Sequence, residues 1–162
     1  MLRLLCTVFF LFVFNLPCYA EIARFNNEFT GSKTIVSSID RDKEIKYTQA
    51  PNNITLKKEL LQNKISMTLI LLTSVSSPPA ILDNTNFKFN NANIVSLRTA
   101  VDPYSYSMFF ELNDNFIKEA LNATSLQIQI PMYSNNKNRI KYKEYDISPD
   151  VLNEWKQVIA ME

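Results

Sequence analysis

The chain has 162 residues, with 17 lysines and arginines against 16 aspartates and glutamates, two cysteines, one glycine and no histidine. This length suffices for one domain with its own apolar core. The lack of histidine excludes Ser-His-Asp and Cys-His catalysis and the commonest zinc ligand, and a single glycine excludes the glycine-rich loops that bind nucleotide phosphates. We therefore expect a protein that is not an enzyme and that has no cofactor and no metal site.

The N-terminal segment, residues 1–20, has the three parts of a secretory signal. Arg3 provides a positive charge, an apolar run follows, and small residues at Cys18 and Ala20 fit the site that signal peptidase cleaves. We predict cleavage between Ala20 and Glu21, and hence an exported protein, either periplasmic or secreted. Two alternatives stay open. One is an uncleaved membrane anchor, although the run is shorter than the ~20 apolar residues that span a bilayer; the other is a lipoprotein acylated at Cys18.

Cleavage of this signal would leave a neutral chain without cysteine. The signal contains both cysteines, Cys6 and Cys18, and its only charged residue is Arg3, so equal numbers of basic and acidic residues remain. We expect residues 21–162 to form a single β-rich globular domain, in which 21–32 fits either an ordered lead-in or a loose terminus. A neutral domain has no general attraction for nucleic acid or anionic membranes. The expected partner is therefore a protein or an envelope polymer, with no nucleic acid and no transmembrane span in the mature chain.

The first part of this domain has the pattern of extended strands. Residues 34–39 and 44–49 predict a hairpin around a charged turn. The segment 54–62 is ambiguous, because apolar residues alternate with polar ones as in a strand while its second half is rich in helix formers; we prefer the strand. Residues 65–75 are the most apolar stretch after the signal and predict a central strand buried on both faces in its middle.

After two prolines the chain continues in short strands. Phe87 and Phe89 share one face of the first, and Val95 and Leu97 share one face of the next. A further strand follows the turn at Asp102, and these segments are each bounded by Asn, Asp or Pro. Such spacing indicates an antiparallel sheet or a small β-sandwich.

Two helices are expected, over about 114–123 and 149–160. The first begins near Asn113 or Asp114, and the second has Ser148 as its N-cap followed by a proline. Apolar residues predict the buried face of the first helix, and these are Phe116, Ile117, Ala120 and Leu121. Trp155 is the expected anchor of the second. A strand over 125–133, a loop over 135–138 and a return strand over 139–147 lie between the helices. The predicted fold class is α+β and β-rich, an antiparallel sheet or small sandwich with both helices packed on it.

The return strand is one candidate binding surface. Arg139, Lys141 and Lys143 lie on one face by the period of two, with tyrosines nearby. Basic residues interleaved with aromatics can follow a phosphate backbone or another polyanion. The alternative is a solvated edge strand whose lysines discourage aggregation. We prefer the alternative because the domain is neutral.

A second candidate is the aromatic turn after Asp102. Tyr104 and Tyr106 in such a turn can contact a protein or a glycan. The alternative is that these tyrosines pack over the sheet, with Phe109 and Phe110 divided between its cover and its core.

Three functional hypotheses follow. The first is an exported, non-catalytic binding or accessory protein of a bacterial periplasm or envelope; the many asparagines are typical of an AT-rich bacterial genome. The alternative is a secreted effector or inhibitor that acts on a host or competitor protein. The second alternative is a carboxylate-based hydrolase, which needs two Asp or Glu carboxyls facing each other at roughly 5–10 Å across a cleft.

Overall fold

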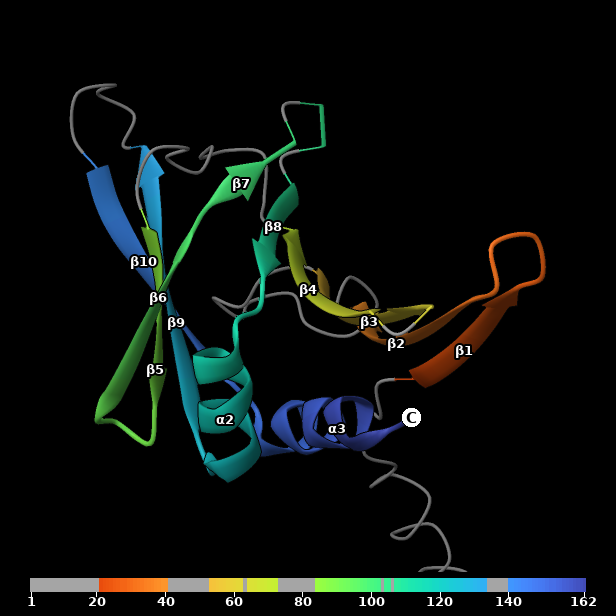
Figure 1. The fold of residues 1–162 in the computed structure, drawn as a ribbon. Coiled ribbons are helices and arrows are strands. Elements are labelled where there is room, and N and C mark those ends of the chain that lie inside the picture. Colours follow the sequence, from red (N-terminus) through yellow and green to blue (C-terminus); the bar gives the residue numbers. More distant parts are fainter. Residues whose placement is uncertain are drawn as a thin grey trace, which may run out of the picture.

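The described residues fold into two antiparallel sheets with two helices beside them (Figure 1). The structure is a computed structural model, and it describes residues 21–40, 53–62, 64–72, 84–102, 104–105, 107–133 and 140–162. The predicted signal, the predicted strand over 44–49 and the predicted loop over 135–138 lie outside the described residues. Among the helices that are described, none is long and apolar enough to cross a membrane.

The larger sheet has six strands within the described residues, in the order β1-β2-β3-β4-β8-β7. Its first four strands are neighbours in chain order, each paired with the one before it, and β4 pairs on its other edge with the distant β8. The strands are β1 (Glu21–Asn27), β2 (Ser32–Asp40), β3 (Asn53–Leu61), β4 (Lys64–Leu72), β7 (Ala100–Val101) and β8 (Ser107–Glu111). Residues 21–32, for which both an ordered lead-in and a loose terminus are open from the sequence, therefore contain the edge strand β1.

The smaller sheet has four described strands, in the order β10-β9-β5-β6. They are β5 (Asn84–Phe89), β6 (Asn93–Arg98), β9 (Leu126–Tyr133) and β10 (Ile140–Ile147). β6 and β7 follow each other closely in sequence but belong to different sheets, so the chain crosses between the sheets after Arg98. The antiparallel, β-rich α+β fold predicted from the sequence is therefore confirmed.

The alternation of apolar and polar residues places the strands as predicted, with two corrections. The predicted hairpin of 34–39 with 44–49 is wrong, because β2 pairs with β1 on one edge and with β3 on the other. Residues 54–62 lie almost entirely in β3, and its buried Ile54 and Leu56 alternate with half-buried neighbours, so the strand interpretation is confirmed. The prediction that the next strand is buried on both faces is wrong. In β4 the inward Leu69 is fully buried, but the outward Thr68 and Ile70 are only half-buried. The core lies against one face of this sheet, and its other face is partly open to solvent.

Four phenylalanines join both sheets and a helix in the core. The ring of Phe87 lies 5.3 Å from that of Phe110 in the other sheet and 5.1 Å from that of Phe116, centroid to centroid. Phe89 lies 5.2 Å from Phe116. All three pairs meet edge to face, the arrangement that aromatic quadrupoles favour. The cluster fixes the two sheets against each other and against the helix that carries Phe116.

Both helices begin where their capping residues predict. α2 (Asp114–Asn122) is capped by Asn113, whose side-chain oxygen accepts a hydrogen bond from the Phe116 amide at 2.8 Å. α3 (Pro149–Ala160) is capped by Ser148 with proline in its first turn. One detail of the α2 prediction is wrong: Leu121, assigned to the apolar face, is 42% exposed, because α2 packs against the core through the buried Phe116 and Ala120 and the half-buried Ile117.

Polar contacts attach α3 to the larger sheet. The Ser37 hydroxyl of β2 donates to the Glu154 carboxylate at 3.1 Å, and both residues are buried. The Lys58 ammonium of β3 donates to the carbonyl of Ile159 at 2.8 Å and to the carbonyl of Met161. Lys58 thereby binds the carbonyl end of α3, where a cation also interacts favourably with the helix dipole.

Candidate functional site

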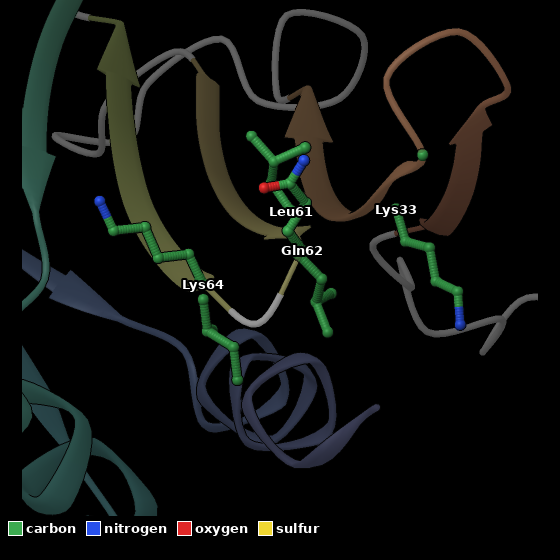
Figure 2. Close-up of a pocket in the computed structure, with 7 residues that line it drawn as sticks. Lys33, Leu61, Gln62 and Lys64 are labelled. Carbon is green, nitrogen blue, oxygen red and sulfur yellow. The ribbon is translucent and has the colours of Figure 1, made fainter.

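A hollow lies where two hairpin turns of the larger sheet meet, and it is shown in Figure 2. It has a volume of about 390 Å³. Its lining comes from the β1–β2 hairpin and from the β3–β4 hairpin, and consists of Gly31, Lys33, Leu60, Leu61, Gln62, Lys64 and Ile65. Leu61 and Gln62 lie between Lys64 on one side and Lys33 on the other (Figure 2).

Left-handed backbone positions shape both turns beside this hollow. Gly31 has a φ of +68°, and its amide donates to the Asn27 carbonyl at 2.8 Å. A Cβ at Gly31 would meet no atom within 4 Å, so the positive φ alone favours glycine there. Gln62 has a φ of 52° in the tight β3–β4 turn. The two turns set the ends of the strands side by side.

Charge and apolar surface are combined in this first hollow. Lys33 and Lys64 are exposed, while Leu60 is half-buried and Ile65 is 61% exposed. Leu60 and Ile65 are directly opposite each other on neighbouring strands, so their side chains share the face that elsewhere covers the core. The hollow therefore suits a ligand with an apolar part and a negative charge.

A second hollow, of about 540 Å³, adjoins the first at Ile65. Its lining comes from the start of β4, the end of β8 and the first turns of α2, and consists of Ile65, Ser66, Met67, Thr68, Glu111, Leu112, Asp114 and Ile117. Together we call the two hollows the Ile65 groove. The groove has lysines at one end, the exposed carboxylates of Glu111 and Asp114 at the other, and apolar side chains between them.

The basic strand predicted as a binding surface is the edge strand β10. Lys141 is opposite Met132 and Lys143 is opposite Ile130, so both lysines share a face with core residues but extend beyond the core and are exposed. The Lys143 ammonium lies 5.9 Å from the centroid of the Tyr145 ring. Arg139 lies outside the described residues. These lysines do not line the Ile65 groove.

The aromatic turn also lies apart from the groove. Tyr104 is 93% exposed between β7 and β8, and Tyr106 lies outside the described residues. Asp102 organises the turn, since its carboxylate accepts hydrogen bonds from the Tyr104 amide at 2.9 Å and the Ser105 hydroxyl at 2.7 Å. These bonds lower the pKa of Asp102, the backbone bond having the larger effect. Phe110 is buried and Phe109 is 36% exposed, which confirms their division between core and cover, but the expectation that the tyrosines pack over the sheet is wrong for Tyr104.

Sequence reasoning missed the groove, although it assigned most of its residues to the correct elements. The sequence predicts that Ile65 is part of a buried strand, and nothing in the neighbouring residues indicates that β8 stops short of it. Gly31 was the one local signal, because a single glycine in a chain this long marks a position that needs a left-handed backbone.

Comparison with known proteins identifies the fold. No protein-family model matches the chain, and no curated protein has a similar sequence. The structure is similar to the crystal structure of invasion associated protein B from Bartonella henselae, with a TM-score of 0.54 and 7% sequence identity. The match covers 88% of this chain and 94% of that one. At such low identity the similarity shows a shared fold.

Proposed function

We propose that this chain is an exported, non-catalytic binding or accessory protein whose ligand occupies the Ile65 groove. The observation that carries the proposal is the combination of an exposed isoleucine, half-buried leucines and separated charges in two adjoining hollows. An apolar patch framed by polar residues is typical of an interaction site. The expected partner is a protein or envelope polymer with both apolar and charged groups.

The groove predicts a specific loss of binding when Ile65 is replaced. Ile65→Asp places a charge in the apolar centre and is expected to abolish capture of the natural partner from the envelope fraction. The fold should be retained, because substitutions at exposed positions usually change stability by no more than about 0.5 kcal/mol. Ile94→Asp is a matched control, since Ile94 is also a strand residue and is 60% exposed against 61% for Ile65. A partner captured equally by both variants would contradict the proposed site.

Export predicts the N-terminus of the mature protein. We expect N-terminal sequencing after cell fractionation to find a soluble chain that begins at Glu21, because small residues precede it at the cleavage position. A chain that begins at Cys18 and carries a lipid would show an anchored lipoprotein instead. Material that retains Arg3 in the membrane fraction would show an uncleaved anchor.

The alternative function is a secreted effector or inhibitor acting on a host or competitor protein. It is favoured by the name of the structural neighbour, which describes a bacterial protein associated with invasion. The two functions differ in compartment, so the fractionation above separates them. Protein in the growth medium favours the effector, and protein retained in the periplasm favours the accessory role.

The second alternative, a carboxylate-based hydrolase, has one observation in its favour. Glu111 and Asp114 line the same hollow. Hydrolysis of an envelope polymer that is lost in both Glu111→Gln and Asp114→Asn would support it and would contradict a purely binding role.

A further inference from the structure

The central strand β4 is longer than the strand beside it. β4 pairs with β8 only from Thr68, opposite Glu111, to Leu72, opposite Ser107. One more backbone bond follows, from the Leu112 amide to the Met67 carbonyl at 2.9 Å, and the chain then leaves the sheet for α2 (Figure 1). On its other edge, β4 remains paired with β3 as far as Lys64. Among the described residues, the first part of β4 therefore has a strand neighbour on one edge only.

The hydrogen-bonding pattern of the sheet determines which backbone N–H and C=O groups lie on this open edge. In antiparallel sheets, successive residues direct their N–H and C=O groups alternately to the two neighbours. Met67 directs its carbonyl to the β8 side. Ile65, two residues earlier, therefore directs both its N–H and its C=O to the same side, where β8 has already ended. Such an edge is a template for another strand.

The second hollow of the groove lies along this edge. Ser66 and Thr68 point to one face of the sheet and Ile65 and Met67 to the other, yet all four line the hollow. A hollow lined from both faces of one strand runs beside the strand rather than over a face. Its remaining wall includes Ile117 from α2.

We propose that the Ile65 groove takes an extended segment of a partner protein as an added strand on β4. The proposal rests on the proposed function and names its partner class. Addition of a strand supplies main-chain hydrogen bonds, here with Ile65, while side chains provide specificity. An apolar residue of the segment would lie against Ile65 and Ile117, within reach of both charged ends of the groove.

For an added strand that runs antiparallel to β4, as β8 does, the charges of the groove predict the order of charges along the segment. A strand that continues the line of β8 runs antiparallel to β4, so it passes first by Glu111 and Asp114 and then towards Lys64. A basic residue therefore precedes the apolar one, and an acidic residue follows it. In this order each charge of the segment lies near an opposite charge of the groove, whereas the reverse order would place like charges side by side.

Two synthetic peptides test the proposal on the full mature chain. The first is Ser-Thr-Lys-Val-Asp-Thr-Ser, in which Lys and Asp directly flank Val and so share the face of Glu111 and Lys64 when Val is opposite Ile65. The second exchanges its Lys and Asp; both carry fluorescein, and binding is followed by anisotropy at low salt. We expect the first to bind at least ~10-fold more tightly. Glu111→Lys should reverse or remove this preference, whereas Glu144→Lys, an exposed glutamate on β10, should not. Equal binding of the two peptides, or binding of neither, would overturn the proposal.

Amide hydrogen exchange separates strand addition from other modes of occupancy. We expect exchange at the Ile65 amide to slow at least ~10-fold when the first peptide is bound, because that N–H gains an acceptor. If Ile65→Asp abolishes capture of the natural partner but the Ile65 amide of the wild type is unprotected in the complex, strand addition is wrong and the proposed function stands. If capture survives Ile65→Asp, both fail. Protection that depends on protein concentration without peptide would assign the edge to a second copy of this chain and overturn the proposal.

Discussion

Replacing Trp155 with alanine is expected to lower the free energy of unfolding by about 3–5 kcal/mol, the range for truncating a large buried aromatic residue. Trp155 is fully buried in the middle of α3, where the helix covers the larger sheet. Domains of this kind have only about 5–15 kcal/mol of stability in total. Urea unfolding should be followed by circular dichroism, because Trp155 is the one tryptophan of the chain and its fluorescence is lost in the variant.

Two further variants serve as controls for the loss of stability in Trp155→Ala. Leu121→Ala removes an apolar helix residue that is 42% exposed, and is expected to change stability by no more than about 0.5 kcal/mol. Trp155→Phe keeps an aromatic ring and removes an indole N–H that has no hydrogen-bond partner within the described structure, so it should cost clearly less than alanine. A Trp155→Ala protein as stable as Leu121→Ala would contradict the role of α3 in closing the core.

The features that sequence analysis predicted correctly depend on residues close together in the chain. The caps at Asn113 and Ser148 need only three neighbouring residues to form their hydrogen bonds. Alternation along β5 and β6 assigns Phe87 and Val95 to the core without reference to any partner strand. For this reason the elements, their types and most of their buried faces could be predicted.

The pairing of distant strands could not be predicted in the same way. A period of two determines which face of a strand is buried, but it does not determine which strand lies beside it. That β4 pairs with β8 rather than with β5, which follows it in sequence, is decided by the packing of the whole core. The half-buried outer face of β4 has the same origin, because alternation cannot show whether a second layer covers Ile70.

The Ile65 groove depends on these non-local relations and so was not predicted. The groove exists because β8 ends at Glu111, opposite Thr68, whereas β4 extends back to Lys64. These two strands are far apart in the sequence. The two surfaces that sequence reasoning did single out, the lysines of β10 and the tyrosine turn, contain unusual residue types. The groove instead is lined by common residue types, and only their position in the fold distinguishes them.

Lys58→Met is expected to lower the free energy of unfolding by about 1–3 kcal/mol, the cost of leaving buried hydrogen-bonding groups without partners. Lys58 is 4% exposed, and its ammonium donates to the carbonyls of Ile159 and Met161 at the end of α3. Methionine keeps most of the apolar stem and removes the donor. Exchange of the Met161 amide, which donates to Gln157 at 3.0 Å, should accelerate because the last turn of α3 loses its attachment.

Lys57→Met is the matched control for this change. Lys57 is the neighbouring residue, its side chain is 37% exposed, and it pairs with Glu59 at 3.0 Å. An exposed ion pair of this kind contributes about 0–1 kcal/mol. Equal stability of the Lys58→Met and Lys57→Met proteins would show that the contact between β3 and the end of α3 contributes nothing to folding.

The pH dependence of the difference in stability between the wild type and Lys58→Met tests the role of Lys58 independently. Burial lowers the pKa of Lys58 from its ordinary value of 10.5, and the Glu162 carboxylate partly opposes the shift. Between the lowered pKa and 10.5 the unfolded chain binds more protons at this lysine than the folded chain, so its contribution to stability rises with pH through that window. Burial raises the pKa of Tyr145 and acts in the opposite sense above 10.0, but Tyr145 is present in both proteins and cancels in their difference. The wild type should therefore gain stability over Lys58→Met as the pH rises towards 10.5, and a gap that narrows would contradict the lowered pKa.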